Sequence, residues 1–313
     1  MRELLRARRP WLEATGWALA AIGAASFLHA LWQSFLGDGG AAYDLHAYLH
    51  AGRHLLEGVP LYGPMEINDP GAFRYPPLFA LLAVPLALLP EEPVTWAYRA
   101  VGLRLVRYLV GSWRATGVAL LFPQLQIELI ALNVTLPLAA AARMSLRGPA
   151  PRVGTALLPF TATLKVGSAL LVPYLWVTRR HRRGAVVAGI GAVGAAAAVH
   201  ALLDPGSWRD YVASLGQQAG SANDAPYVGD QLLFLVPSTL GDFLLRLALA
   251  VALTGLALWR RWDWLAFVAA AIAVPTLWVA RLAPLVAVPR LVLEDWRLSR
   301  EGSAAVAPRA TRT

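Results

Sequence analysis

The sequence contains no cysteine, which excludes a disulfide framework and thiolate chemistry. Charged residues are scarce, since they make up 15% of the 313 residues whereas 57% are hydrophobic. Lysine is almost missing: Lys165 stands alone beside 27 arginines. A soluble globular domain carries about 25% charged residues, so this composition predicts a membrane protein.

Long apolar runs recur from one end of the chain to the other. They predict an all-α, polytopic transmembrane helical bundle that forms a single integral membrane domain over residues 1–313, with no soluble domain. The N-terminus resembles a signal peptide, but many spans follow it, so we expect an uncleaved first helix. The expected spans cover about 15–36, 75–90, 94–112, 115–142 (bent near Pro123), 153–178, 184–203, 238–259 and 264–293.

The net charge of +9 could indicate a nucleic-acid partner, but the arginines lie beside apolar spans rather than in one patch. Contact with anionic lipid head groups and the positive-inside rule explain them more simply. Arg2, Arg6, Arg8 and Arg9 then place the N-terminus in the cytoplasm. We expect a multi-pass cell-membrane protein with both termini cytoplasmic, two outer loops at about 37–74 and 204–230, and no nucleic-acid partner.

Two basic segments, 143–152 and 179–183, both read as cytoplasmic although one apolar run joins them. A single crossing would place one of them outside. Two half-length helices with a break near Lys165–Ser168 would keep both inside. Irregular backbone at membrane depth is tolerated where it is buried in protein or faces a cavity, so the break marks a candidate site. The run 264–293, interrupted by Pro275, is expected to be a helix pair for the same reason.

The first outer loop contains an amphipathic helix pattern that starts at Asp44 and stops at Gly58 and Pro60. Its placement between spans predicts an interfacial helix with its apolar side towards the membrane. The apolar face carries Leu45, Tyr48, Leu49, Gly52, Leu55 and Leu56, and the polar face carries His46, His50, Arg53, His54 and Glu57.

Asp44 has two interpretations. Aspartate directly before an amphipathic run is a preferred N-cap residue, and a carboxylate at the membrane surface could instead be a general base for an acceptor hydroxyl. The histidines at 46, 50 and 54 share one helix face and could bind zinc, or they could simply form a polar face towards head groups and water. We expect no metal site and no cofactor.

Lys165 lies in an apolar stretch, where an ammonium needs a carboxylate, carbonyl dipoles or an anionic ligand. Salt bridges or snorkelling to the interface would explain any single charge of this kind. As a set, these cations favour a site for a lipid phosphate, because arginine binds phosphate in a bidentate manner. The set consists of Lys165, Arg99, Arg104, Arg246 and Arg281. The triplet Asn133-Val134-Thr135 matches a glycosylation acceptor, but it lies within a span and is discounted.

The stretch from Asp44 to Pro90 resembles glycosyltransferase family 87, whose members are GT-C membrane enzymes. The motifs that carry the resemblance are Asp44 with Tyr48, Ala51-Gly52, Gly58-Val59-Pro60-Leu61-Tyr62, Phe73, Tyr75-Pro76-Pro77-Leu78, and Pro85-Leu86 with Leu89-Pro90. A looser similarity continues through Asn133, Lys165, residues 179–183, Trp208 to Tyr211, and Trp278.

The resemblance implies transfer of a sugar, typically mannose, from a polyprenyl phosphate carrier to a lipid or glycan hydroxyl on the outer face of the membrane. It assigns the catalytic base to Asp44. The matching positions Tyr48, Tyr75, Asn133 and Lys165 are the implied substrate-binding residues. The charge argument above adds Arg99, Arg104, Arg246 and Arg281 to the expected substrate-binding set.

Three departures from the family pattern leave other functions open. Asn133 lacks a preceding Gly-Gln, Ser168 stands near Lys165 where proline is usual, and residues 274–281 contain no histidine. A diverged, non-catalytic binder or transporter of lipid-linked sugars would fit these departures. A third hypothesis is a metal-dependent membrane enzyme built on His46, His50 and His54.

Overall fold

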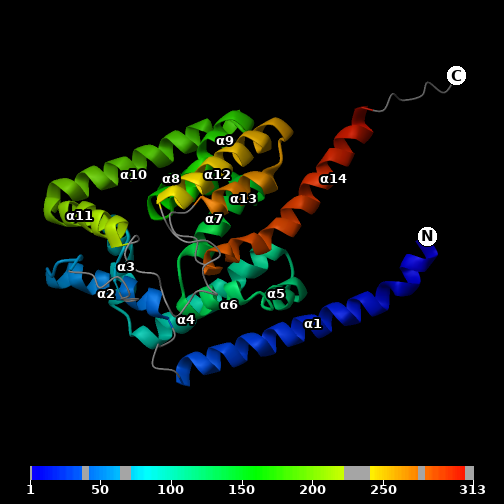
Figure 1. The fold of residues 1–313 in the computed structure, drawn as a ribbon, viewed down its shortest axis with the longest axis horizontal. Helices are drawn as coiled ribbons and strands as arrows, with labels where there is room; N and C mark the ends of the chain where they lie inside the picture. The colour runs from blue at the N-terminus through cyan, green and yellow to red at the C-terminus, as the bar shows by residue number, and fades with distance from the viewer. Residues whose placement is uncertain (1, 37–41, 64–71, 222–239, 274–278, 307–313) are drawn as a thin grey trace.

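The structure is a computed structural model that describes residues 2–36, 42–63, 72–221, 240–273 and 279–306 (Figure 1). These residues form helices and no strand, as the sequence predicts. The α-helices are α1 (Arg2–Leu36), α2 (Tyr43–Glu57), α3 (Pro77–Ala87), α4 (Glu91–Val110), α5 (Trp113–Ala119), α6 (Pro123–Ala131), α7 (Thr135–Arg147), α8 (Pro151–Leu164), α9 (Leu171–Thr178), α10 (Arg183–Leu203), α11 (Pro205–Ser221), α12 (Leu240–Arg260), α13 (Asp263–Ile272) and α14 (Val288–Val306). Three 3₁₀ helices join them: η1 (Val166–Leu170), η2 (Arg180–Arg182) and η3 (Val279–Ala287).

Candidate membrane-spanning helices lie where the first and sixth spans were expected. Within the described residues, Pro10–Leu36 and Arg180–Leu203 are each long and apolar enough to cross a membrane. Two further pairs, α3 with α4 and α6 with α7, pass the same test together but are bent by 114° and 112°. The all-α membrane bundle is therefore confirmed, with two to four candidate spans.

The predicted separate crossing over residues 75–90 is wrong. Helix α3 has eleven residues, which is about 16 Å at the rise of an α-helix and falls short of an apolar core of about 30 Å. It lies alongside α2 instead, so closely that a Cβ placed on Gly52 would lie 2.9 Å from the Cβ of Ala87. Helix α4 runs from Glu91, which pairs with Arg53, to Tyr108, whose carbonyl accepts from Arg290.

The expected fourth span, 115–142, is divided among α5, α6 and α7. Pro123 does interrupt it, because α6 begins at that residue with proline in the first helical turn. A second break follows Ala131, where Leu132 adopts a left-handed backbone with φ of 59°. The sequence analysis did not predict this break, and it turns out to be central to the candidate site.

The predicted break near Lys165 is confirmed. Helix α8 ends at Leu164, and Lys165 has an extended backbone with φ −142° and ψ 110°. The two basic segments on either side of the α8–α9 run meet again in space: Arg147 and Arg179 both pair with Asp263, and Arg182 donates to the Ser145 carbonyl. The run through α8 and α9 thus returns to the end of the molecule where it began. This is what the sequence analysis expected, since both basic segments were predicted to be cytoplasmic.

The last apolar run is also divided, into α13, η3 and α14. Pro275 and Trp278 lie outside the described residues.

The second polar segment contains α11, which begins beside Asp204. The Asp204 carboxylate accepts hydrogen bonds from the Ser207 backbone N–H and hydroxyl, and these bonds hold the pKa of Asp204 below its usual value.

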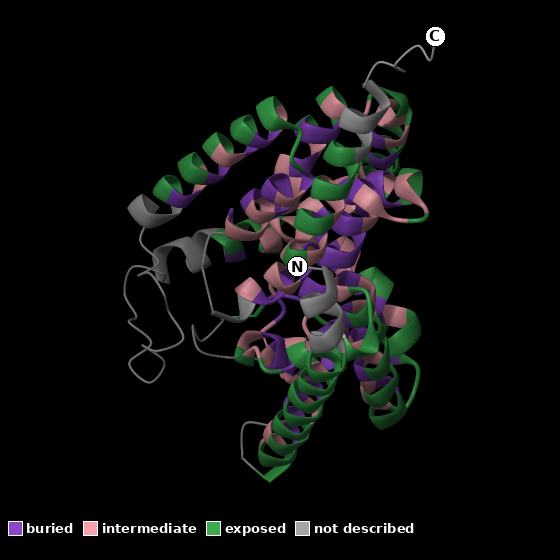
Figure 2. Ribbon diagram, turned by 90° about the vertical axis from the view of Figure 1, so that its right-hand side faces the viewer, coloured by how far each residue is buried: buried purple, intermediate pink, exposed green. Residues whose placement is uncertain are grey.

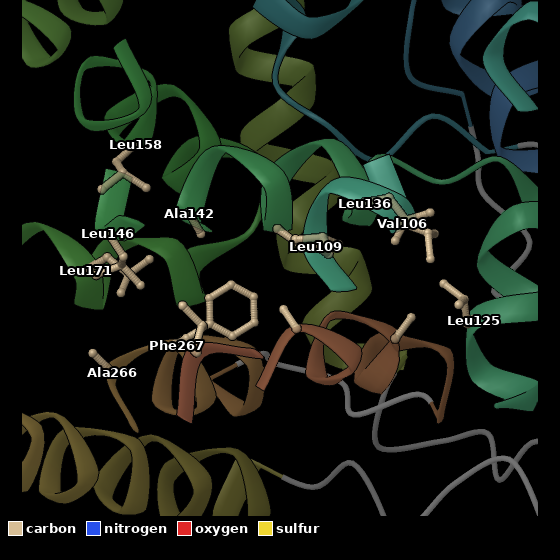
Figure 3. Packing of buried hydrophobic residues seen from close by; sticks show 14 of the residues in the cluster. Val106, Leu109, Leu125, Leu136, Ala142, Leu146, Leu158, Leu171, Ala266 and Phe267 are labelled. Carbon is tan, nitrogen blue, oxygen red and sulfur yellow. The ribbon is translucent and has the colours of Figure 1, made fainter. Parts of the chain in front are cut away.

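The hydrophobic core lies between α4, α6, α7, α9 and α13. Figure 3 shows its side chains converging from these helices, and they include Leu109, Leu125, Leu136, Leu171 and Phe267. Helix α1 contributes little to this core and is exposed along most of its length (Figure 2). Its bare apolar side chains, such as Trp11 at 76% exposure, suit contact with lipid.

The cluster around Asp263 should dominate the stability of the end of the molecule that holds both basic segments. Asp263 is fully buried and pairs with Arg147 and Arg179, while the Tyr174 hydroxyl donates to it at 2.7 Å. Removing one member of a buried pair leaves an uncompensated charge, which costs about 3 kcal/mol. We therefore expect Asp263→Asn to destabilise the protein by about that amount in thermal unfolding in detergent.

Asp210→Asn is the matched control for this variant, because Asp210 is exposed on α11. It should leave the unfolding transition in place. Equal stability of Asp263→Asn and the wild type would show that the buried cluster contributes nothing.

Candidate functional site

The candidate site forms where two helix breaks meet. Asn133 lies in the break between α6 and α7, and Lys165 lies in the break between α8 and η1. The Lys165 Nζ donates to Asn133 Oδ1 at 2.8 Å. Asn133 Oδ1 also accepts the Thr135 backbone N–H at 3.1 Å, so one side-chain oxygen serves both the start of α7 and the lysine.

Asp44 joins this pair from a third element. Asn133 Nδ2 donates to Asp44 Oδ2 at 2.8 Å. Asp44 lies in the first turn of α2, whose N-cap residue is Ala42 with a left-handed backbone. The Ala42 N–H donates to the Ile130 carbonyl at 2.8 Å and ties α2 to the end of α6. The N-cap interpretation of Asp44 is therefore wrong, and the carboxylate is directed to Asn133 instead.

Two further polar residues, Thr135 and Glu128, belong to the same network and were not predicted to have a role. The Lys165 ammonium contacts the Thr135 hydroxyl. That hydroxyl lies 3.0 Å from Glu128 Oε1 and 2.8 Å from Asn133 Oδ1. Glu128 is 4% exposed. The sequence did contain a signal for Glu128, because it is the one acidic residue between positions 93 and 203.

Tyr48 and Tyr75 lie beside Asp44 in a mostly buried aromatic cluster. Their hydroxyls are 3.4 Å apart, and the Tyr62 hydroxyl donates to the Tyr75 carbonyl at 2.7 Å. Tyr211 of α11 packs on Tyr62 with ring centroids 5.7 Å apart. Burial, followed by the proximity of Tyr75 and Asp44, raises the pKa of Tyr48 well above its usual value. Tyr48 therefore remains a protonated donor beside the carboxylate.

A cavity of about 50 Å³ lies beside Lys165 and Thr135. Beyond these two residues and Ser168, its walls are apolar. Lys165 is the one cation among the described residues that line it. The apolar lining consists of Leu138, Ala139, Ala142, Gly167, Phe267, Ala270, Ala271 and Pro284.

The predicted arginines do not line this cavity in the described part of the chain. Arg99 is 3% exposed and lies against the rings of Trp96 and Phe35, at 4.8 and 5.8 Å. Arg104 is exposed on α4, and Arg246 is buried in α12. The side chain of Arg281 lies outside the described residues. A phosphate-binding role for these arginines stays a prediction, and so does that of Lys165, which does line the cavity.

The three histidines of α2 have partners of other kinds. His46 Nε2 lies 2.8 Å from Glu91 Oε1, and His54 Nδ1 lies 3.1 Å from the Pro60 carbonyl oxygen. His50 is exposed, and its ring packs 4.1 Å from that of His54. Among the described residues, no group of three or more histidine, aspartate, glutamate or cysteine side chains has a geometry that could hold a metal ion.

Comparison with known protein families identifies one match. The model of glycosyltransferase family 87 matches residues 73–293. The matched range contains Glu128, Asn133, Thr135 and Lys165, whereas Asp44 precedes it. Comparison with curated proteins yields no match, and comparison with solved structures yields none either.

The bridging role of Asn133 leads to a stability prediction. Asn133→Leu keeps the approximate size of the side chain but removes a donor from Asp44 and an acceptor from Lys165. Loss of one partner of a part-buried polar group costs about 1–3 kcal/mol, so the melting temperature should fall. His50→Ala, at an exposed position of α2, should change neither the melting temperature nor the metal content. An unshifted melting transition in Asn133→Leu would contradict the bridge.

Proposed function

This chain belongs to glycosyltransferase family 87, and from that premise we propose that it transfers a sugar from a polyprenyl phosphate carrier to a hydroxyl group of a lipid or glycan acceptor. The observation that carries the proposal is the hydrogen-bonded sequence Asp44–Asn133–Lys165, whose lysine lines an apolar cavity. A carboxylate and an ammonium thus lie in one site, bridged by the amide group of Asn133.

The proposed reaction is a direct displacement at the anomeric carbon. Asp44 takes the proton of the acceptor hydroxyl, whose oxygen forms a bond to that carbon. The bond between the anomeric carbon and the phosphate oxygen breaks, and the polyprenyl phosphate leaves with the electron pair. One base acting on one displacement inverts the configuration of the sugar.

Lys165 would stabilise the phosphate as its charge grows in the transition state. A fixed cation beside a poorly solvated cavity is well suited to this role, because it needs no reorganisation during the reaction. Asn133 would hold the lysine and Asp44 at a constant separation, since its amide bonds both. Tyr48 and Tyr75 would line the acceptor side, next to Asp44.

The cavity supports a lipid-linked donor over a free sugar nucleotide. Its lining is apolar apart from Lys165, Thr135 and Ser168, which suits an isoprenoid chain attached to a single phosphate. Polyprenyl-phosphate-mannose is the donor to test first. We further propose that the chain is a single membrane domain. Arg147, Arg179 and Arg182 belong to the two basic segments, which the positive-inside rule places in the cytoplasm. The end that bears Asp44 would then face outward.

A transfer assay tests the role of Asp44. Membranes containing the wild type should move radiolabelled mannose from polyprenyl-phosphate-mannose to membrane lipid. Asp44→Asn keeps the size of the side chain and an oxygen for the Asn133 amide, but it removes the base. Loss of general base catalysis lowers the rate by about 10²–10⁴-fold, and we expect transfer to fall by that factor.

Asp210→Asn is the control for this assay, and it should transfer at the wild-type rate. Undiminished transfer by Asp44→Asn would overturn the assignment of the base. If the wild type bound the donor without transferring sugar, a non-catalytic binder of lipid-linked sugars would be the better account.

A second prediction concerns the cavity. Ala271 lines it, and Ala271→Phe would fill space that the proposal assigns to the prenyl chain. We expect KM for the lipid-linked donor to rise at least about tenfold, with a smaller change in kcat, because the substitution removes binding of a part of the substrate remote from the reaction. Ala188→Phe, at an exposed position of α10, is the matched control. An unchanged KM in a well-folded Ala271→Phe variant would place the donor elsewhere.

A further inference from the structure

Glu128 lies one hydroxyl group away from Lys165. It extends from α6 and is almost fully buried, where an ionised carboxylate is costly without a compensating cation or donor. Its Oε1 is 3.0 Å from the Thr135 hydroxyl oxygen, and the same oxygen contacts the Lys165 ammonium. Glu128, Thr135 and Lys165 therefore form a continuous polar contact from α6 through α7 to the break after α8.

The single proton of the Thr135 hydroxyl decides how this contact works. The hydroxyl accepts from the Lys165 ammonium, which has no lone pair to offer. It must then donate to one of two oxygens, Glu128 Oε1 or Asn133 Oδ1. Asn133 Oδ1 already accepts from the Lys165 ammonium and from the Thr135 backbone N–H. Because Asn133 Oδ1 already has these two donors, we assign the hydroxyl proton to Glu128 Oε1.

We propose that Glu128, acting through the Thr135 hydroxyl, is a positioning residue for Lys165: it keeps the ammonium charged and in place beside the cavity. The role of that charge in sugar transfer rests on the proposed function, whereas the coupling between Glu128 and Lys165 does not.

The other polar and charged groups around Lys165 do not duplicate the contact that Glu128 makes through Thr135. Asp44 of α2 contacts the Asn133 amide, which in turn accepts from the Lys165 ammonium. Tyr98 of α4 lies close enough to Glu128 and Asp44 to interact with both electrostatically. The described lining residues of α13 and η3 are apolar. The two carboxylates therefore act on the ammonium through different bridging side chains and can be separated by mutation.

The chain offers a direct measurement, because Lys165 is its single lysine. Protein labelled with ¹³C at lysine Cε, purified in detergent, gives one lysine side-chain signal, and its chemical shift can be followed as a function of pH. Removing a nearby negative charge disfavours the protonated ammonium. We expect Glu128→Gln to move the titration midpoint of this signal to lower pH by about one unit.

Variants of Thr135 test the route of the coupling. Thr135→Val removes the hydroxyl at nearly constant shape and should move the midpoint in the same direction, whereas Thr135→Ser restores the hydroxyl and should restore the midpoint. Thr155→Val is the matched control, since Thr155 is fully buried and its hydroxyl bonds the Pro151 carbonyl of its own helix. Midpoints that stay at the wild-type value in both Glu128→Gln and Thr135→Val would overturn the proposal.

The transfer assay separates this proposal from the proposed function. In an active enzyme, Glu128→Gln should shift the alkaline limb of the rate against pH by the same amount as the NMR midpoint. A shifted midpoint in a protein that transfers no sugar would uphold the positioning role and reject the transferase. A wild-type midpoint in an active Glu128→Gln enzyme would reject the positioning role and uphold the transferase.

Discussion

An ammonium group in the middle of an apolar segment needs polar partners, because its desolvation is not otherwise compensated. Lys165 is such a group, and the helices around it supply its polar partners. Lys165 lies at the break after α8, and the break between α6 and α7 brings Asn133 and Thr135 to its Nζ. The carboxylates of Asp44 and Glu128 then balance the charge from α2 and α6.

The molecule keeps two charge networks apart. At one end, Asp263, Glu294 and Asp295 pair with arginines of α7 and α14 and with Arg179, which follows α9; such close pairs suit a structural role. At the other, the charges of Lys165 and the two carboxylates are separated by neutral side chains and lie beside a cavity.

Much of this arrangement follows from sequence patterns with a simple physical basis. The amphipathic α2, the break at Lys165 and the approach of the two basic segments could all be predicted, since each depends on local periodicity or charge. The shortness of α3 could not, because its apolar residues suit packing on α2 as well as contact with lipid. The second break at Leu132 and the link from Glu128 to Lys165 depend on tertiary packing. Arg99 shows the same limit, because its place between Trp96 and Phe35 depends on where α1 lies.

The central claim is that the donor phosphate binds at Lys165 with the anomeric carbon facing Asp44. The most direct test is a cryo-EM structure of the full chain with a non-transferable polyprenyl phosphonate analogue of the sugar donor. The account predicts phosphonate oxygens within about 4 Å of Lys165 Nζ, the prenyl chain along α7 and α13, and the sugar between Lys165 and Asp44. A phosphonate bound elsewhere, for example among the arginines near Asp263, would contradict it.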